Sequence, residues 1–243
     1  MSFELTYKPF GERSILVEWP AIIDETILRD IIIFKMQISK KKNKAIVDLK
    51  SAYNSLLIVY DTVYGNFENE VKLLKKLYGT LDLKHDIKSK IWKIPVCYDE
   101  TFGIDLEAIS KEKGLSKGEI IKRHSEAVYT VYFIGFLPGF LYLGGLDESL
   151  YSPRKSTPRL KIEIGSVAIG GKQTGIYPSE SPGGWNIIGN SPILFFDVNK
   201  DKPCFASPGD KIVFNPITLN EHKNIKAQVD AGVYKLESEV IDG

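Results

Sequence analysis

The sequence predicts an α+β protein, with an N-terminal half of alternating strands and helices followed by a turn-rich β-barrel. Residues 1–90 contain only three of the 20 glycines and two of the 12 prolines, so most of both lie further along the chain. The N-terminal half instead carries apolar residues at helix and strand spacings. A compositional shift of this kind separates two domains that are built differently.

Four runs of apolar and β-branched residues near the N-terminus predict strands. Tyr53 and Asn54 predict a turn between the second and the third run. The four runs cover residues 14–19, 45–49, 55–60 and 90–96.

Two helices are predicted between these strands. Asp24 is a suitable N-cap for a helix with apolar residues at three- and four-residue spacing. Asn66 or Asn69 begins the second helix, which Gly79 ends. The order β-α-β-β-α-β is the ferredoxin-like pattern, so we expect a ferredoxin-like domain over residues 1–90.

A connector of one strand and two helices is expected over residues 91–127. Gly114 ends its first helix, and Ser116 with Glu119 forms a capping-box start for a second helix that runs to His124. Residues 128–243 consist of short β-branched and aromatic runs separated by Gly and Pro turns. This spacing predicts a closed or nearly closed β-barrel.

The composition is that of an ordinary globular protein, with 43% hydrophobic and 26% charged residues. A formal net charge of +1 gives no reason to expect a nucleic-acid or membrane surface. The sequence has no 18-residue apolar run, and its start lacks the layout of a signal peptide. Two cysteines are no disulfide framework in a chain of this length. We therefore expect a cytoplasmic protein.

Several familiar catalytic sites are disfavoured by the sequence. Residues 165–173 approach a phosphate-binding loop, but Ser166 stands where glycine is required and Gln173 where serine or threonine is required. A G-x-S-x-G nucleophile elbow is absent. The three histidines and two cysteines lack ligand spacing, so no metal site is expected.

Residues 131–185 hold the candidate site, because Gly and Pro alternate there with aromatic residues, as in a shaped loop surface. Trp185 is either core or the wall of a pocket. Arg154 and Arg159 are either surface residues or a pair of guanidinium groups for an anion. Gln173 offers an amide donor and acceptor beside two glycines.

His124 is the histidine that precedes this segment, and two interpretations are open for it. It is either an exposed or capping residue, or an acid, base or donor that faces the loop cluster.

Together with a long ordered set of motifs, these residues make the sequence resemble the family of the B subunit of 5-oxoprolinase. The family is also described as the sporulation-kinase inhibitor KipI and as allophanate hydrolase subunit 1. Its motifs match residues 135–144, 153–159, 165–171, 173–178, 181–189 and 194–197, and the His-Ser pair at residues 124–125. This sequence departs from the family at Glu163-Ile164, at Lys172, and at Asn190, where arginine is common.

The resemblance implies a cyclophilin-like barrel that looks like one half of the carboxyltransferase domain of urea carboxylase. It implies a subunit that acts with subunits A and C to cleave 5-oxo-L-proline to L-glutamate with ATP, and that is inactive alone. The alternative is an inhibitor that docks on a sensor histidine kinase, with Phe136, Phe140 and Tyr142 as anchors. For the enzyme we expect His124 and Gln173 to be catalytic, and the substrate to contact Arg154, Arg159, Gly170, Gly171, Thr174, Tyr177 and Trp185.

Overall fold

The computed structural model describes residues 3–82 and 87–241. Contacts divide the chain into two units, Met1–Ile87 and Lys88–Gly243, and each is described by itself. The α+β class and the barrel are both confirmed. Within the described residues, no helix is long and apolar enough to cross a membrane.

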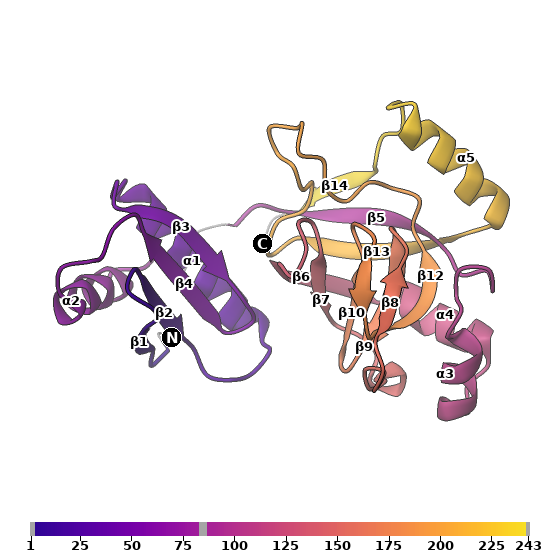
Figure 1. The fold of residues 1–243 in the computed structure, drawn as a ribbon, viewed down its shortest axis with the longest axis horizontal. Coiled ribbons are helices and arrows are strands. Elements are labelled where there is room, and N and C mark those ends of the chain that lie inside the picture. Colours follow the sequence, from indigo (N-terminus) through magenta and orange to yellow (C-terminus); the bar gives the residue numbers. More distant parts are fainter. Residues whose placement is uncertain (1–2, 83–86, 242–243) are drawn as a thin grey trace. The chain divides into compact units, whose positions relative to one another are not determined.

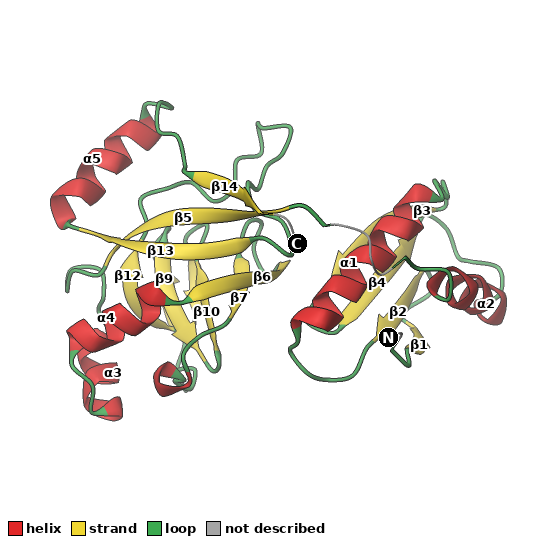
Figure 2. Ribbon diagram, turned by 180° about the vertical axis from the view of Figure 1, so that it is seen from behind, coloured by secondary structure: helices red, strands yellow, loops and turns green. Residues whose placement is uncertain are grey.

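The first unit is a four-stranded antiparallel sheet with two helices (Figure 1). Its strand order is β1-β2-β4-β3, and α1 packs against the sheet, as Figure 2 shows from behind. Asp24 and Asn66 cap the two helices as predicted, each accepting backbone hydrogen bonds through its side chain. The elements are β1 (Thr6–Pro9), β2 (Ser14–Glu18), α1 (Glu25–Lys40), β3 (Ile46–Ser51), β4 (Ser55–Tyr60) and α2 (Phe67–Tyr78).

The predicted fourth strand of a ferredoxin-like sheet is wrong in its placement. The run at residues 90–96 forms β5 (Ser89–Cys97), which belongs to the sheet of the second unit. The edge beside β2 is taken by β1, which pairs with it in a hairpin from Thr6 against Glu18 to Pro9 against Ile15. Pairing with a strand that is next in the sequence costs little loop-closure entropy. The sequence TYKP of β1 has no apolar alternation, so it does not predict a strand.

The second unit is built around a closed barrel of seven strands. The order is β12-β9-β10-β7-β6-β13-β5, and pairing of β12 with β5 closes the ring. All neighbours are antiparallel except β13 and β5, which are parallel. The strands are β6 (Val128–Ile134), β7 (Leu141–Gly144), β9 (Ser166–Gly170), β10 (Gln173–Ile176), β12 (Asn186–Asn190) and β13 (Lys211–Ile217), with β5 as above.

Smaller elements surround this barrel (Figures 1 and 2). β14 (Ser238–Ile241) pairs with β5 from Ser89 to Trp92, and β8 (Arg159–Ile162) pairs with β11 (Ser181–Gly183) as a separate ribbon. The helices are α3 (Leu106–Lys113), α4 (Lys117–Glu126), α5 (Leu219–Asp230) and a short 3₁₀ turn (Glu148–Leu150). Residues 91–127, expected as a connector, therefore contribute a barrel strand and two helices that pack on the barrel.

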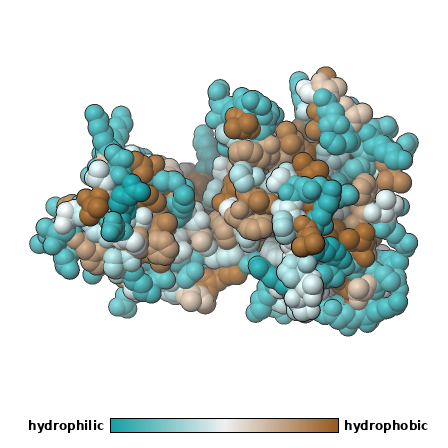
Figure 3. Space-filling view, in the orientation of Figure 1, coloured by the Kyte–Doolittle hydropathy of each residue, from teal (hydrophilic) through white to brown (hydrophobic). Residues whose placement is uncertain are grey.

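Two apolar clusters lie on opposite sides of the barrel wall. The larger fills the interior and includes Val131, Leu141, Ile169 and Phe214, with Ile120 of α4 packed against them. Strand alternation sends the intervening residues outward, where a second cluster contains Phe140, Ile162, Ala168, Tyr177, Trp185 and Ile187. The space-filling view shows apolar residues interspersed with polar ones on the visible face of the second unit (Figure 3). The candidate residues are distributed over both sides of this wall.

Candidate functional site

His124 lies inside the barrel and is fully buried. Its ring stacks on Phe214 with centroids 4.7 Å apart. Nδ1 lies 2.7 Å from the Tyr98 hydroxyl, and Nε2 lies 2.9 Å from Oγ1 of Thr174. The expectation that His124 faces the loop cluster is therefore corrected, because α4 ends against the barrel core and carries the ring inward.

The hydrogen bonds around His124 fix its tautomer. The Thr174 hydroxyl donates to the carbonyl of Ala168 at 3.0 Å, so its oxygen accepts from Nε2–H. Nδ1 then accepts from Tyr98. Burial lowers the pKa of His124 to about 3, which keeps the ring neutral. Both ring nitrogens of His124 are therefore used in hydrogen bonds within the protein, and neither is free to bind a substrate.

Thr174 belongs to the same interior network and is itself fully buried. In the structure its hydroxyl is therefore enclosed together with His124. Tyr177 is also buried, packing edge-on against Phe140 with ring centroids 5.2 Å apart. Burial raises the pKa of Tyr177, so its hydroxyl is neutral.

Trp185 is the centre of the outer aromatic cluster and is 4% exposed. It meets Phe140 edge-to-face at 5.6 Å and Tyr142 at 6.1 Å. A Cβ at Gly170 would lie 2.5 Å from its indole ring, so glycine is required for the ring to lie on β9. Of the two interpretations of Trp185, packing of a buried cluster is the one that the structure shows.

Arg154 covers this cluster from the solvent side. Its guanidinium carbon lies 5.5 Å from the centre of the Trp185 ring, within the range of a cation–π interaction. Gln173 opposes Gly170 across β9 and β10, which places its half-buried side chain on the same outer face. Arg154, Gln173, Gly170 and Trp185 therefore lie together on the outer face of the barrel.

Gly171 has a backbone φ of +66°, the left-handed conformation that its place in the turn predicts. Its N–H donates to the carbonyl of Ser152 at 2.7 Å, and its own carbonyl accepts from Ser152 N–H. The Gly171 amide is therefore already paired with the backbone of Ser152. An added Cβ would meet nothing within 4 Å, so the conformation alone requires glycine.

Phe136 is an exposed aromatic residue on a strained turn. Its φ is +67°, and Leu137 N–H donates to the carbonyl of Gly135 at 2.9 Å, closing a three-residue turn around it. The side chain is 64% exposed, whereas Phe140 is buried. Of the two, Phe136 is the one that can anchor a partner protein.

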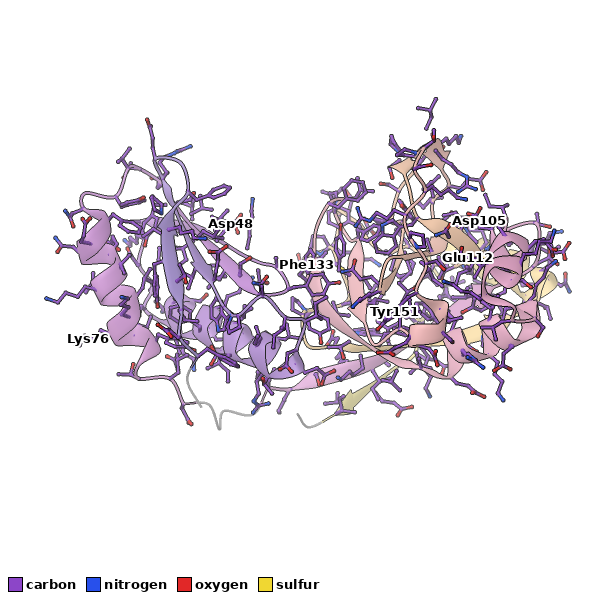
Figure 4. The ribbon with its side chains drawn as sticks, turned by 90° about the horizontal axis from the view of Figure 1, so that it is seen from below. Asp48, Lys76, Asp105, Glu112, Phe133 and Tyr151 are labelled. Carbon is purple, nitrogen blue, oxygen red and sulfur yellow. The ribbon has the colours of Figure 1, made fainter. Side chains whose placement is uncertain are left out.

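Arg159 is partly buried, and its guanidinium group is held by an ion pair. One guanidinium nitrogen, Nη2, lies 2.7 Å from the Asp105 carboxylate, and Lys155 reaches the same oxygen at 2.9 Å. The second Asp105 oxygen accepts from Ile187 N–H at 2.7 Å, which ties the turn before α3 to β12. Figure 4 labels Asp105 within the second unit beside α3.

Sequence reasoning missed Asp105, because a single aspartate at the start of a helix usually indicates a cap. Here its side chain makes no capping bond to α3. Burial would raise the pKa of Asp105, but the hydrogen bonds from Arg159, Lys155 and Ile187 outweigh burial and lower it. The carboxylate is therefore ionised and holds two cations.

A pocket of about 270 Å³ opens beside this ion-pair cluster. It lies between β8, β12 and the turn before α3. Its lining includes Phe102, Ile104, Arg159, Ile162, Glu163 and Ile187. Thr101, Lys161, Ser166 and Asn190 complete it, and a neighbouring hollow of about 440 Å³ continues past Asn190 along α5.

Asn190, the departure from the family's usual arginine, is a structural link. Its amide nitrogen donates to the Ile164 carbonyl at 2.8 Å, and its oxygen lies 2.8 Å from Nε2 of His222. His222 also packs its ring against Phe102, with centroids 4.4 Å apart. Asn190 therefore anchors α5, which sequence reasoning did not predict.

The glycine-rich segment at residues 165–173 does not fit a nucleotide phosphate. It forms β9, a turn and β10, so no helix follows to direct N–H groups at an anion. Gly165 is required because a Cβ there would lie 2.2 Å from the Ser191 carbonyl oxygen. Among the described residues, no group of three or more His, Cys, Asp or Glu side chains could hold a metal ion.

Comparison with known proteins identifies the family of this chain. The carboxyltransferase domain, subdomain C and D, matches residues 5–206. The chain belongs to this family. The match spans both units, so the first unit is part of the family's architecture and not an unrelated addition.

Curated relatives extend over most of the chain. It is 37% identical over 206 residues to the B subunit of 5-oxoprolinase from Haemophilus influenzae, covering 85% of this chain and 95% of that protein. It is 31% identical over 238 residues to the B subunit of 5-oxoprolinase from Bacillus subtilis, covering 94% and 99%.

Solved structures agree on the fold. A conserved uncharacterized protein from Pyrococcus horikoshii is 39% identical, with a TM-score of 0.53 over 89% of this chain and 100% of that one. The urea amidolyase of Kluyveromyces lactis superposes with a TM-score of 0.85 over 99% of this chain and 16% of that one. At 24% identity this second likeness speaks for the fold alone.

Proposed function

We propose that the chain is the B subunit of an ATP-dependent 5-oxoprolinase complex, which cleaves 5-oxo-L-proline to L-glutamate with subunits A and C. The observation that carries the proposal is the likeness to the Haemophilus influenzae protein, which covers 85% of this chain and 95% of that protein. The extent of the match matters, because likeness of the barrel domain alone would be compatible with many functions.

The chemistry explains why such a chain needs partners. A lactam carbonyl is resonance-stabilised, and ATP supplies the phosphoryl group that activates it. Cleavage also needs donors aimed at the developing negative charge on oxygen. On this chain Arg154 and Gln173 lie beside the outer aromatic cluster, while His124 is sealed in the core. In this proposal the chain binds and orients substrate, and the partners supply the nucleotide site.

The direct test is reconstitution. The full chain is purified alone and together with subunits A and C, and release of glutamate and ADP from 5-oxo-L-proline is measured. We expect no turnover by the chain alone and turnover by the three together. Turnover by subunits A and C without this chain would contradict the proposal.

Phe136→Ser supplies a matched variant for the assembly step, since its side chain is exposed and its loss spares the core. We expect weaker co-purification of the partner subunits with this variant. Co-purification of a histidine kinase from the native host in place of subunits A and C would favour the inhibitor alternative.

A further inference from the structure

A pocket in the first unit lies where its two helices meet its sheet. Its volume of about 430 Å³ falls within the range of roughly 300–1,000 Å³ typical for small-molecule sites. Its floor is apolar and consists of buried or partly buried side chains of α1, α2 and β3, namely Ile38, Ile46, Leu74 and Leu77. Leu73 of α2 also lines the pocket, with a side chain that is 60% exposed. An exposed leucine beside a concave apolar floor is typical of a binding surface.

The rim of this pocket carries positive charge. Lys41, the C-cap of α1, and Lys76, in the last turn of α2, both line the pocket and are exposed. Among the described residues, neither lysine has an ion-pair partner. Lys41 belongs to a run of four lysines within residues 40–44, in the connection from α1 to β3. Free ammonium groups at the edge of an apolar floor favour a ligand that is negatively charged at one end.

The loop that carries Lys41 is held by its own hydrogen bonds. Lys42 has a φ of +47°, which turns the chain back toward the sheet. The Asn43 side chain accepts from Ala45 N–H at 3.0 Å, and the Asn43 carbonyl accepts from Ile46 N–H at 3.0 Å. The backbone at Lys41 is therefore in place beside the floor before any ligand binds.

Glu70 is the acidic residue of this lining and lies in the first turn of α2. The Tyr60 hydroxyl donates to its carboxylate at 3.3 Å, and burial raises the pKa of Tyr60, so the hydroxyl keeps its proton. Glu70 and Lys76 are separated by roughly 9 Å along the helix axis. Two lysines against one carboxylate leave one positive charge in excess, and this charge lies away from Glu70.

We propose that this pocket binds an apolar monocarboxylate, such as a medium-chain fatty acid, with its carboxylate between Lys41 and Lys76 and its chain along the leucines of α2. A single negative charge matches the excess of one positive charge, and the hydrocarbon chain covers the apolar floor. A nucleotide or a sugar would find few polar partners on that floor. Binding of such a ligand does not require the reaction proposed above.

The test uses the full chain with labelled leucine methyl groups and follows their NMR shifts during titration with octanoate. We expect saturable shifts of Leu73 and Leu77, and an affinity that falls about fourfold for each methylene group removed, from octanoate to hexanoate to butanoate. Octylammonium, with the same chain and the opposite charge, should not saturate these signals at the same concentrations. Equal saturation by octylammonium, or none by octanoate, would overturn the proposal.

Lys41→Gln and Lys76→Gln test the rim. Both side chains are exposed, so these changes spare the fold. We expect each variant to weaken octanoate binding about three- to fivefold, the strength of an exposed ion pair. Lys44→Gln is the matched control, because it removes the same charge from the same loop without lining the pocket. An equal loss of affinity in the control would show unspecific attraction of the anion and overturn the site.

Leu73→Asn tests the apolar floor, since its exposed side chain can be replaced without opening the core. We expect octanoate binding, followed at Leu77, to weaken about tenfold from the loss of buried apolar contact. Unchanged affinity would contradict the proposed placement of the chain. Loss of subunits A and C from this variant, with no octanoate binding by the unchanged protein, would assign the pocket to a protein interface and overturn the proposal.

Discussion

The interior of the barrel and the pocket beside Arg159 use similar residue types in opposite ways. Inside, Tyr98, His124 and Thr174 form a closed chain of hydrogen bonds that ends on a backbone carbonyl. At the pocket, Arg159 and Lys155 share one carboxylate, which leaves one positive charge in excess. A polar residue is therefore available to bind a ligand only where its neighbours leave part of its charge or hydrogen-bonding capacity unused.

Removing the interior histidine should have the largest effect. His124→Ala deletes a ring stacked on Phe214 and leaves the Tyr98 hydroxyl without its acceptor. We expect the free energy of unfolding to fall by about 4 kcal/mol, measured by urea denaturation. Ser125→Ala on the same helix is the control, with a change below about 0.5 kcal/mol. Unchanged stability with lost turnover in the complex would instead make His124 a chemical participant.

The buried histidines should also make stability depend on pH. The pKa of His124 falls from 6.5 in the unfolded chain to about 3 in the fold, so the unfolded chain binds the extra proton between these values. Stability should therefore be full above pH 6.5 and decline on acidification, by at most about 1.4 kcal/mol per pH unit for each such histidine.

His222 provides the comparison for this pH effect, because burial lowers its pKa as well. His222→Gln keeps a donor for Asn190 and should reduce the slope of unfolding free energy between pH 5 and 6.5, measured by denaturation. A slope that His222→Gln removes entirely would show that His124 does not titrate as a buried neutral ring.

The adjacent glycines separate packing from backbone conformation. Gly170→Ala drives a methyl group into the Trp185 ring, whereas Gly171→Ala meets open space at a φ of +66°. We expect losses of about 2–3 kcal/mol for Gly170→Ala and about 1–2 kcal/mol for Gly171→Ala. Calorimetry measures both, and Trp185 fluorescence should change for the first variant alone. The reverse order would mean that the indole ring moves aside easily.

Gln173→Ala should have the smallest effect on stability. Its side chain is half-buried on the outer face, so we expect a change within about 0.5 kcal/mol. Turnover of the reconstituted complex should nevertheless fall, with Lys172→Ala, an exposed neighbour, unaffected. Equal turnover for both variants would show that the aromatic face takes no part in the reaction.

Local signals predicted much of the fold. Asp24 and Asn66 begin helices because a short acceptor before an apolar repeat satisfies free N–H groups, and that information lies within four residues. The sheet to which β5 belongs could not be predicted locally, because it depends on partners such as β13, more than a hundred residues away. The capping box formed by Thr218 and Glu221 is a local sequence signal for the start of α5.

The candidate site was predictable only in part. The φ of Gly171 follows from a turn between two adjacent strands, so local sequence suffices. The burial of His124 and the pairing of Arg159 with Asp105 depend on contacts 50 and 54 residues away. The residue type shows which hydrogen bonds and charges a side chain can offer. Only the fold shows whether other residues of the protein already use them.

The position of β5 has a consequence for how the barrel folds. This strand comes first in the second unit, yet it pairs with β12, β13 and β14, all near the other end of the chain. Such long-range pairing slows folding, because a large loop must close before the contacts form. Until the C-terminal strands are synthesised, β5 is an unpaired apolar edge open to association with other chains.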